Sequence, residues 1–147
     1  LAGELQGLGG QGRGLALHRA ARFDAAGADA VIFSENSVDV YNPKVVRSTT
    51  GSIFHLPVVL GASLEATIAA AKQAGYQVFA ATAGGTTLPE LEQSILAKPT
   101  LWMFGNEAWG FEPHILELAD LQVAVPIYGA AESLNLATAA SICLYAT

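Results

Sequence analysis

Apolar, strand-like segments alternate with helix-like segments along this chain of 147 residues. The run TLWMF at 100–104 is rich in residues that favour strands, whereas Ser63 and Pro113 are residue types that commonly start helices. This alternation predicts an α/β fold with a mainly parallel sheet flanked by helices. The expected strands are Ala30–Phe33, Leu56–Leu60, Gln77–Ala81, Thr100–Phe104 and Leu121–Val125, and the expected helices are Leu15–Ala26, Pro43–Thr50, Ser63–Ala74, Leu88–Leu96, one that begins at Pro113, and Leu134–Thr147.

Ligands of parallel sheets bind beyond the carboxyl ends of the strands. Thr82, Gly105 and Pro126 each follow an expected strand directly, so we expect their loops to share one pocket. The first of these loops is expected to run over Thr82–Thr87.

The overall composition is that of a globular protein, with 52% apolar and 14% charged residues. So much apolar surface predicts a homodimer that buries part of it, including part of the last helix. The single cysteine, Cys143, is expected in the core. A cytoplasmic protein is expected, because no secretion signal opens the chain and no apolar run reaches the roughly 20 residues of a membrane span.

Two loops carry more polar side chains than a simple turn requires. The first, Gly105–Gly110, holds Asn106 and Glu107 between two glycines. The second places Glu132, Ser133 and Asn135 just before an uncharged C-terminal helix. Ser133 is expected to cap that helix, which would leave the Asn135 carboxamide for another use.

These loops resemble motifs two and three of the SpoU-type (TrmH-like) RNA ribose 2′-O-methyltransferases of the SPOUT superfamily. The matching residues are Phe104–Glu107 with Gly110, Val125–Ile127 and Glu132–Asn135, and the runs Asn42–Arg47 and Phe54–Val58 are similar to ribosomal-RNA members. The resemblance implies S-adenosylmethionine as cofactor, a deep C-terminal trefoil knot, and a structured RNA as substrate, ribosomal RNA rather than transfer RNA.

The resemblance also implies roles for individual residues. Thr82, Gly105, Val125, Ile127 and Leu134 are expected to bind the cofactor, with close backbone approach at Gly105 and apolar walls elsewhere. The expected catalytic residues are Arg19, Glu107, Ser133 and Asn135.

Motif one departs from the family pattern, which has an asparagine, a glycine two residues later and an arginine four beyond that. This chain lacks the asparagine before either candidate arginine, Arg19 or Arg22. Arg19 is the preferred equivalent. The departure leaves open a loss of activity, a different base, or an error in this part of the sequence.

Two alternatives accompany this hypothesis. The run Gly7–Gly12 fits the dinucleotide-binding pattern with Glu35 further on, which would indicate a nicotinamide-dependent oxidoreductase. A catalytically inactive RNA-binding relative is a second alternative, and cofactor binding separates these classes.

With 7 basic and 13 acidic residues, the net charge of −6 predicts weak RNA binding by this chain alone, as for a catalytic domain without its N-terminal RNA-binding domain. No metal site is expected, because His18, His55 and His114 are scattered.

Overall fold

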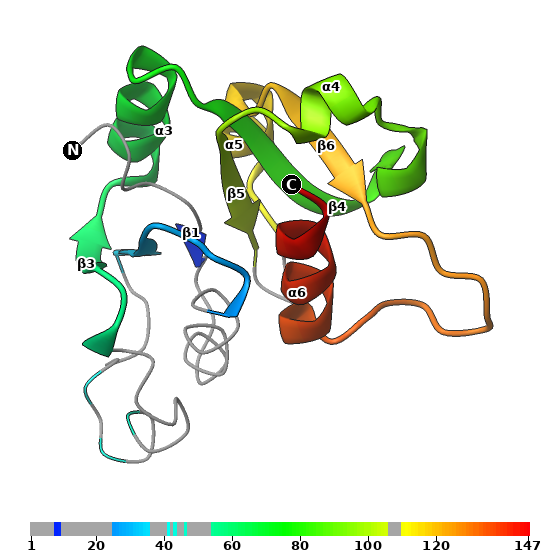
Figure 1. Ribbon diagram of the computed structural model, residues 1–147, viewed down its shortest axis with the longest axis horizontal. Helices are drawn as coiled ribbons and strands as arrows, with labels where there is room; N and C mark the ends of the chain where they lie inside the picture. Colours follow the sequence, from blue (N-terminus) through cyan, green and yellow to red (C-terminus); the bar gives the residue numbers. More distant parts are fainter. Residues whose placement is uncertain are drawn as a thin grey trace.

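The computed structural model describes residues 8–9, 25–35, 41, 43, 46, 54–105 and 110–147. These residues form a six-stranded sheet in the order β3-β2-β1-β5-β4-β6, and all its pairings are parallel (Figure 1). The predicted α/β class with a parallel sheet is therefore confirmed. The strands are β1 (Leu8–Gly9), β2 (Val31–Ser34), β3 (Val58–Ala62), β4 (Gln77–Thr87), β5 (Thr100–Phe104) and β6 (Leu121–Ala124).

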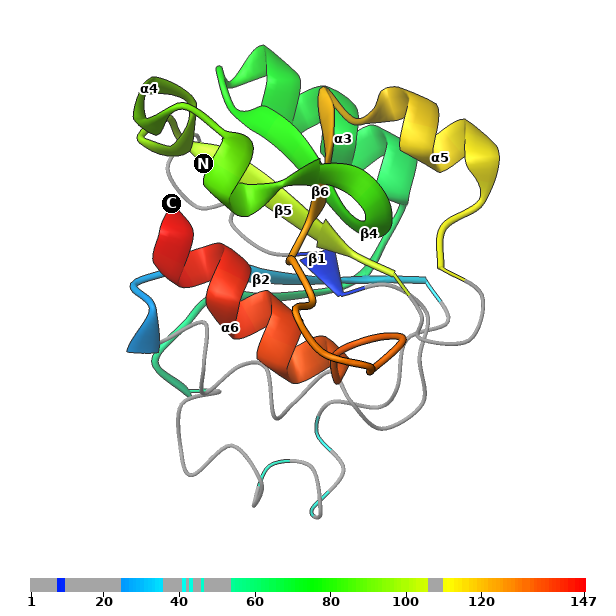
Figure 2. The same ribbon diagram turned by 90° about the vertical axis from the view of Figure 1, so that its right-hand side faces the viewer.

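Helices cover both faces of the sheet. One face packs against α6, and the opposite face packs against α3 and α5 (Figure 2). The described helices are α3 (Leu64–Gln73), the 3₁₀ turn η2 (Leu88–Glu90), α4 (Gln93–Leu96), α5 (Pro113–Leu118) and α6 (Leu136–Ala146). None of the helices in the described part of the chain is long and apolar enough to cross a membrane.

Strand β5 shows how the sequence divides the core between these two faces. Alternate side chains of a strand point to opposite faces, so Trp102 and Phe104 pack on the α6 side while Leu101 and Met103 pack on the α3 and α5 side. The Trp102 ring lies edge-on to Phe79 with ring centres 5.2 Å apart. The Trp102 Nε1–H donates to Thr147 Oγ1 at 3.2 Å, which ties the end of the chain to the central sheet.

Helix α3 begins and ends as its sequence predicts. The Ser63 hydroxyl accepts a hydrogen bond from the backbone N–H of Ala66 at 3.3 Å, and Gly75 follows the helix with a φ of 88°. The predicted helices over 15–26 and 43–50 lie mostly outside the described residues.

The structure corrects two predictions between residues 82 and 96. The segment expected as a loop at Thr82–Thr87 continues strand β4, because Ala81 and Thr86 both pair with Val123 and the residues between them form a bulge. A Cβ atom on Gly85 would lie 2.4 Å from the backbone of Gln122, so this approach requires glycine. The helix expected at Leu88–Leu96 is divided into η2 and α4, because Leu91 and Glu92 have extended backbones.

Candidate active site

A cavity of about 400 Å³ lies at the carboxyl ends of β5 and β6, beside the bulge in the middle of β4. The strand register explains its position: Ala81 pairs with both Phe104 and Val123, so the residues that follow these three positions are close in space. Walls are added by α5, by the segment between β6 and α6, and by α6 itself. The lining residues are Ala81, Thr82, Ala83, Gly105, Gly110, Phe111, Leu116, Val123, Val125, Ile127, Glu132, Ser133, Leu134, Leu136 and Ala139.

The residues predicted to bind a cofactor all line this one cavity: Thr82, Gly105, Val125, Ile127 and Leu134. Ser133, predicted to be catalytic, lines it as well. Asn135 and Pro126 are absent from the lining, although both belong to the segment that forms one wall. Arg19 and Glu107 lie outside the described residues.

Thr82 brings an unsatisfied polar group to this cavity. Its Oγ1 atom is buried and has no hydrogen-bond partner among the residues that the structure describes. An unpaired buried hydroxyl is destabilising, by about 1–3 kcal/mol in typical proteins. Thr82 lines the cavity but this atom is closed to water, so a bound molecule would supply the missing partner after a small rearrangement of the wall.

Gly105 is a glycine for a reason within the chain itself. A Cβ atom there would lie 2.9 Å from the backbone C and O atoms of Gly110 and 3.1 Å from a ring carbon of Phe111. The prediction of close ligand approach is therefore not needed to explain this residue. Gly105 and Gly110 are in contact and both line the cavity.

The prediction that Ser133 caps the last helix is wrong. Helix α6 begins at Leu136, and its N-cap is Asn135, whose Oδ1 accepts the backbone N–H of Ala137 at 2.9 Å. Both residue types are good caps, and the later of the two is used because the helix starts later than expected. Only the Oδ1 atom makes this bond, so the Asn135 carboxamide is partly committed to the fold. Ser133 instead lines the cavity.

Several lining residues were not singled out from the sequence. Leu136 and Ala139 are three residues apart on α6 and so lie on one face, a spacing that the sequence does display. Phe111 and Leu116 enter through α5 and its approach, for which the sequence carries no clear signal. Glu132 was noted as a polar residue of the loop without a role, and it is the one ionisable side chain in the described lining.

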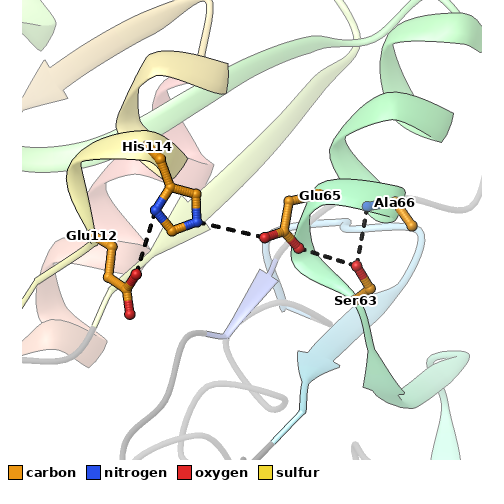
Figure 3. Close-up of polar contacts among 5 residues, drawn as sticks. All are labelled: Ser63, Glu65, Ala66, Glu112 and His114. Carbon is orange, nitrogen blue, oxygen red and sulfur yellow. Dashed lines mark hydrogen bonds and ion pairs between the residues drawn. The ribbon is translucent and has the colours of Figure 1, made fainter.

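A polar contact outside the cavity positions helix α5, which contributes Leu116 to the wall. His114 Nδ1 lies 3.3 Å from Glu112 Oε2, and His114 Nε2 lies 3.6 Å from Glu65 Oε1 at the start of α3 (Figure 3). Hydrogen bonds from its own backbone N–H and from the Ser63 hydroxyl lower the pKa of Glu65 below its ordinary value. The four side chains thus join the first turns of α3 and α5 at the surface.

Cys143 is excluded as a nucleophile of this site. It is completely buried on the inner face of α6, as predicted for a core residue, and burial raises the pKa of its thiol to about 12. A thiol in that state stays protonated and unreactive at neutral pH.

Comparison with known proteins agrees with this architecture. The 23S rRNA (guanosine(2553)-2′-O)-methyltransferase RlmP of Bacillus subtilis is 41% identical over 123 residues, which cover 83% of this chain and 48% of that protein. The crystal structure of the SpoU methyltransferase AviRb of Streptomyces viridochromogenes, in complex with the cofactor AdoMet, superposes with a TM-score of 0.83 at 32% identity, over 97% of this chain and 59% of that one. An AdoMet-bound rRNA methyltransferase from Sinorhizobium meliloti gives a TM-score of 0.85 at 31% identity, over 98% and 55%.

The chain thus spans about half the length of the curated relatives it matches. The sequence profile of the SpoU rRNA Methylase family matches residues 16–145, nearly the whole chain. This chain therefore belongs to the SpoU rRNA methylase family.

Proposed function

We propose that this chain is the catalytic domain of an enzyme that uses S-adenosylmethionine to methylate a ribose 2′-hydroxyl of structured RNA. Ribosomal RNA is the favoured substrate, because RlmP and a second similar protein from Streptomyces viridochromogenes are both named as 23S rRNA 2′-O-methyltransferases. The observation that carries the proposal is that predicted motif residues share one cavity, at the ends of β5 and β6 and beside the bulge of β4.

The side chains of this cavity fit the proposed cofactor. S-adenosylmethionine has an adenosine part, a sulfonium cation and an amino-acid end, but no phosphate, so it requires apolar walls with a few polar groups. Val125, Ile127 and Leu134 provide such walls. The unpaired Thr82 hydroxyl can exchange a hydrogen bond with the ligand. No basic side chain that would suit a phosphate is present in the described lining.

The oxidoreductase alternative does not fit the fold. In dinucleotide-binding folds the glycine-rich segment, here Gly7–Gly12, forms a turn directly after a strand. The structure instead places Leu8 and Gly9 within β1, where they pair with β2 on one side and β5 on the other. The match to the SpoU family over most of the chain also speaks against it.

The chemistry that S-adenosylmethionine supplies when bound is an electrophilic methyl group on a sulfonium cation. The protein must position the ribose and stabilise the oxyanion that forms as the 2′-hydroxyl loses its proton to water. We assign this stabilisation to the guanidinium of Arg19, which stays charged, with Glu107 as its orienting partner. Ser133, at the cavity wall, would hold the ribose by a hydrogen bond. The Nδ2 atom of Asn135 could also donate a hydrogen bond to the ribose, because only Oδ1 is used to cap α6.

The proposal includes the trefoil knot and the homodimer that the sequence predicts. The knot is what the family resemblance implies, and the packing of α6 against β4 and β5 is compatible with it. Pulling the unfolded chain taut would reveal a knot, because the measured contour length would be shorter than that of an unknotted chain.

A dimer is supported by apolar side chains that α6 and the preceding loop leave exposed, namely Tyr128, Ile142 and Tyr145. Light scattering that showed a monomer at high concentration would remove the dimer.

The test of the proposed function is methylation of RNA by the full-length protein. Ribosomal and transfer RNA from cells without the gene should be incubated with protein and S-adenosylmethionine, and the nucleosides analysed by mass spectrometry. A new 2′-O-methylnucleoside is the expected product. If the cofactor binds and no RNA is methylated, the inactive RNA-binding relative becomes the better description. This chain is acidic and should bind RNA weakly by itself, so the test uses the full-length protein with its proposed N-terminal RNA-binding domain. The salt concentration should be that of the cytoplasm, where we propose that the protein acts.

A further inference from the structure

We propose that Glu132 selects the cofactor by its charge, so that the site prefers cationic S-adenosylmethionine to S-adenosylhomocysteine, the product whose sulfur is neutral. This inference rests on the proposed function. It names a specificity residue outside the set that the sequence motifs suggested as catalytic or cofactor-binding.

The first observation is that Glu132 has no role in the fold. Its side chain is exposed at the cavity, and it has no hydrogen-bond or ion-pair partner within the part of the chain that the structure describes. Some other glutamates of the chain do serve the fold. Glu90 closes the first turn of η2 by accepting from the backbone N–H of Thr87 at 2.8 Å, and Glu65 contacts Ser63 and His114. Glu132 is thus a carboxylate at a ligand site without a structural task.

The second observation is the distribution of polarity along the cavity. The Thr82 hydroxyl is buried, whereas Glu132 is exposed, so the uncharged polar group lies deeper than the charged one. The residues around them are almost all apolar. A ligand with one neutral end and one charged end would therefore place its charge toward Glu132, because burial of a charge away from water and counter-charge is strongly unfavourable.

The charges of the two reactants also favour this role for Glu132. RNA is anionic, so a carboxylate beside the site repels its phosphates and weakens substrate binding. That disadvantage is offset if the carboxylate attracts the cationic reactant, which is the cofactor. The cofactor and its product share the adenosine and the amino-acid end and differ in the charge on sulfur. A negative group near that sulfur therefore stabilises the cofactor complex selectively.

The experiment compares the affinities of the two compounds by calorimetry on this chain without RNA. We expect Glu132→Gln, which keeps the size and removes the charge, to weaken S-adenosylmethionine binding about three- to fivefold, as for an exposed ion pair. S-adenosylhomocysteine binding should change less than about twofold under the same weak-pair estimate. Glu117→Gln is the matched control: Glu117 is also exposed, lies beside Leu116 on α5, and is absent from the cavity lining, so the ratio of the two affinities should stay at its wild-type value.

Salt gives a second readout that a structural role of Glu132 would not change. Between low salt and ~0.5 M, screening should reduce the preference of the wild-type protein for S-adenosylmethionine, and the Glu132→Gln variant should show no such trend. An affinity ratio that Glu132→Gln leaves unchanged overturns the inference, whether both compounds bind more weakly or neither does. Wild-type protein that binds neither compound would overturn the proposed cofactor itself, together with the inference.

Discussion

Replacing Thr82 by valine should have opposite effects on stability and on ligand binding. Valine has nearly the shape of threonine but lacks the hydroxyl, and the Thr82 hydroxyl is buried without a partner. Removing an unsatisfied buried polar group should raise the free energy of unfolding of the unliganded chain by about 1 kcal/mol. The same change should weaken S-adenosylmethionine binding about three- to tenfold, because it removes one neutral hydrogen bond worth about 0.5–1.5 kcal/mol.

Thr100→Val is the matched control, since Thr100 is a buried threonine whose hydroxyl is satisfied. Its Oγ1 donates to the carbonyl oxygen of Lys98 at 2.8 Å and accepts from Gln77 Nε2 at 2.7 Å. Thr100→Val should therefore lower the free energy of unfolding by about 1–3 kcal/mol, because one N–H of the Gln77 amide loses its acceptor while the other still donates to the Ile95 carbonyl oxygen at 2.8 Å. It should leave the affinity for S-adenosylmethionine unchanged, since Thr100 does not line the cavity.

The assay is urea unfolding of the unliganded variants, followed by calorimetric titration with S-adenosylmethionine. Thr82→Ser, which keeps the hydroxyl, should bind close to wild type. Loss of stability in Thr82→Val of the same size as in Thr100→Val would refute the reasoning, because it would mean that the Thr82 hydroxyl already has a partner in the unliganded protein. Unchanged affinity in Thr82→Val would show that the ligand does not use this group.

The remaining predictions concern the motif residues. Asn135→Ala should lower the free energy of unfolding by about 1 kcal/mol through loss of the α6 cap, whereas Asn135→Asp should retain the cap; urea unfolding measures both. Gly105→Ala should destabilise by about 1–3 kcal/mol in the same assay, since its Cβ would meet the Gly110 backbone at 2.9 Å. Glu107→Ala should reduce the rate of RNA methylation on the order of a hundredfold with little change in Tm. Arg19→Ala should reduce that rate similarly and Arg22→Ala only mildly; the reverse order would reassign this role to Arg22.

The strands could be predicted because their signals are local. The run Thr100–Phe104 alternates between two buried faces, and Pro or Gly residues mark many of the turns around such runs, so β2, β3, β5 and β6 lie within about two residues of their expected positions. The second half of β4 has no such signal, because Thr82–Thr87 is small and polar. What makes it a strand is its pairing with Val123 and Ala124, residues distant in the sequence.

The division of the helix expected at 88–96 could have been foreseen. Thr87 and Glu90 form a capping box, and Pro89 fits the first turn, so the sequence marks a separate short turn here. The start of α6 could not be chosen in the same way, because Ser133 and Asn135 are equally good caps two residues apart. The choice depends on how Ala137, Ala140 and Cys143 fit against the sheet, which is a matter of tertiary packing.

The structure separates two kinds of motif residue that look alike in the sequence. Gly105 and Asn135 satisfy requirements of the fold, one by close backbone contact and the other by capping α6, so their presence does not by itself indicate a ligand. Thr82 and Glu132 satisfy no requirement of the described fold, and one of them is unfavourable to it. A side chain that destabilises the empty protein is typical of a functional site, where it acts in the bound state. Thr82 and Glu132 therefore indicate a cofactor at this cavity more firmly than the glycine and asparagine that make the motifs recognisable.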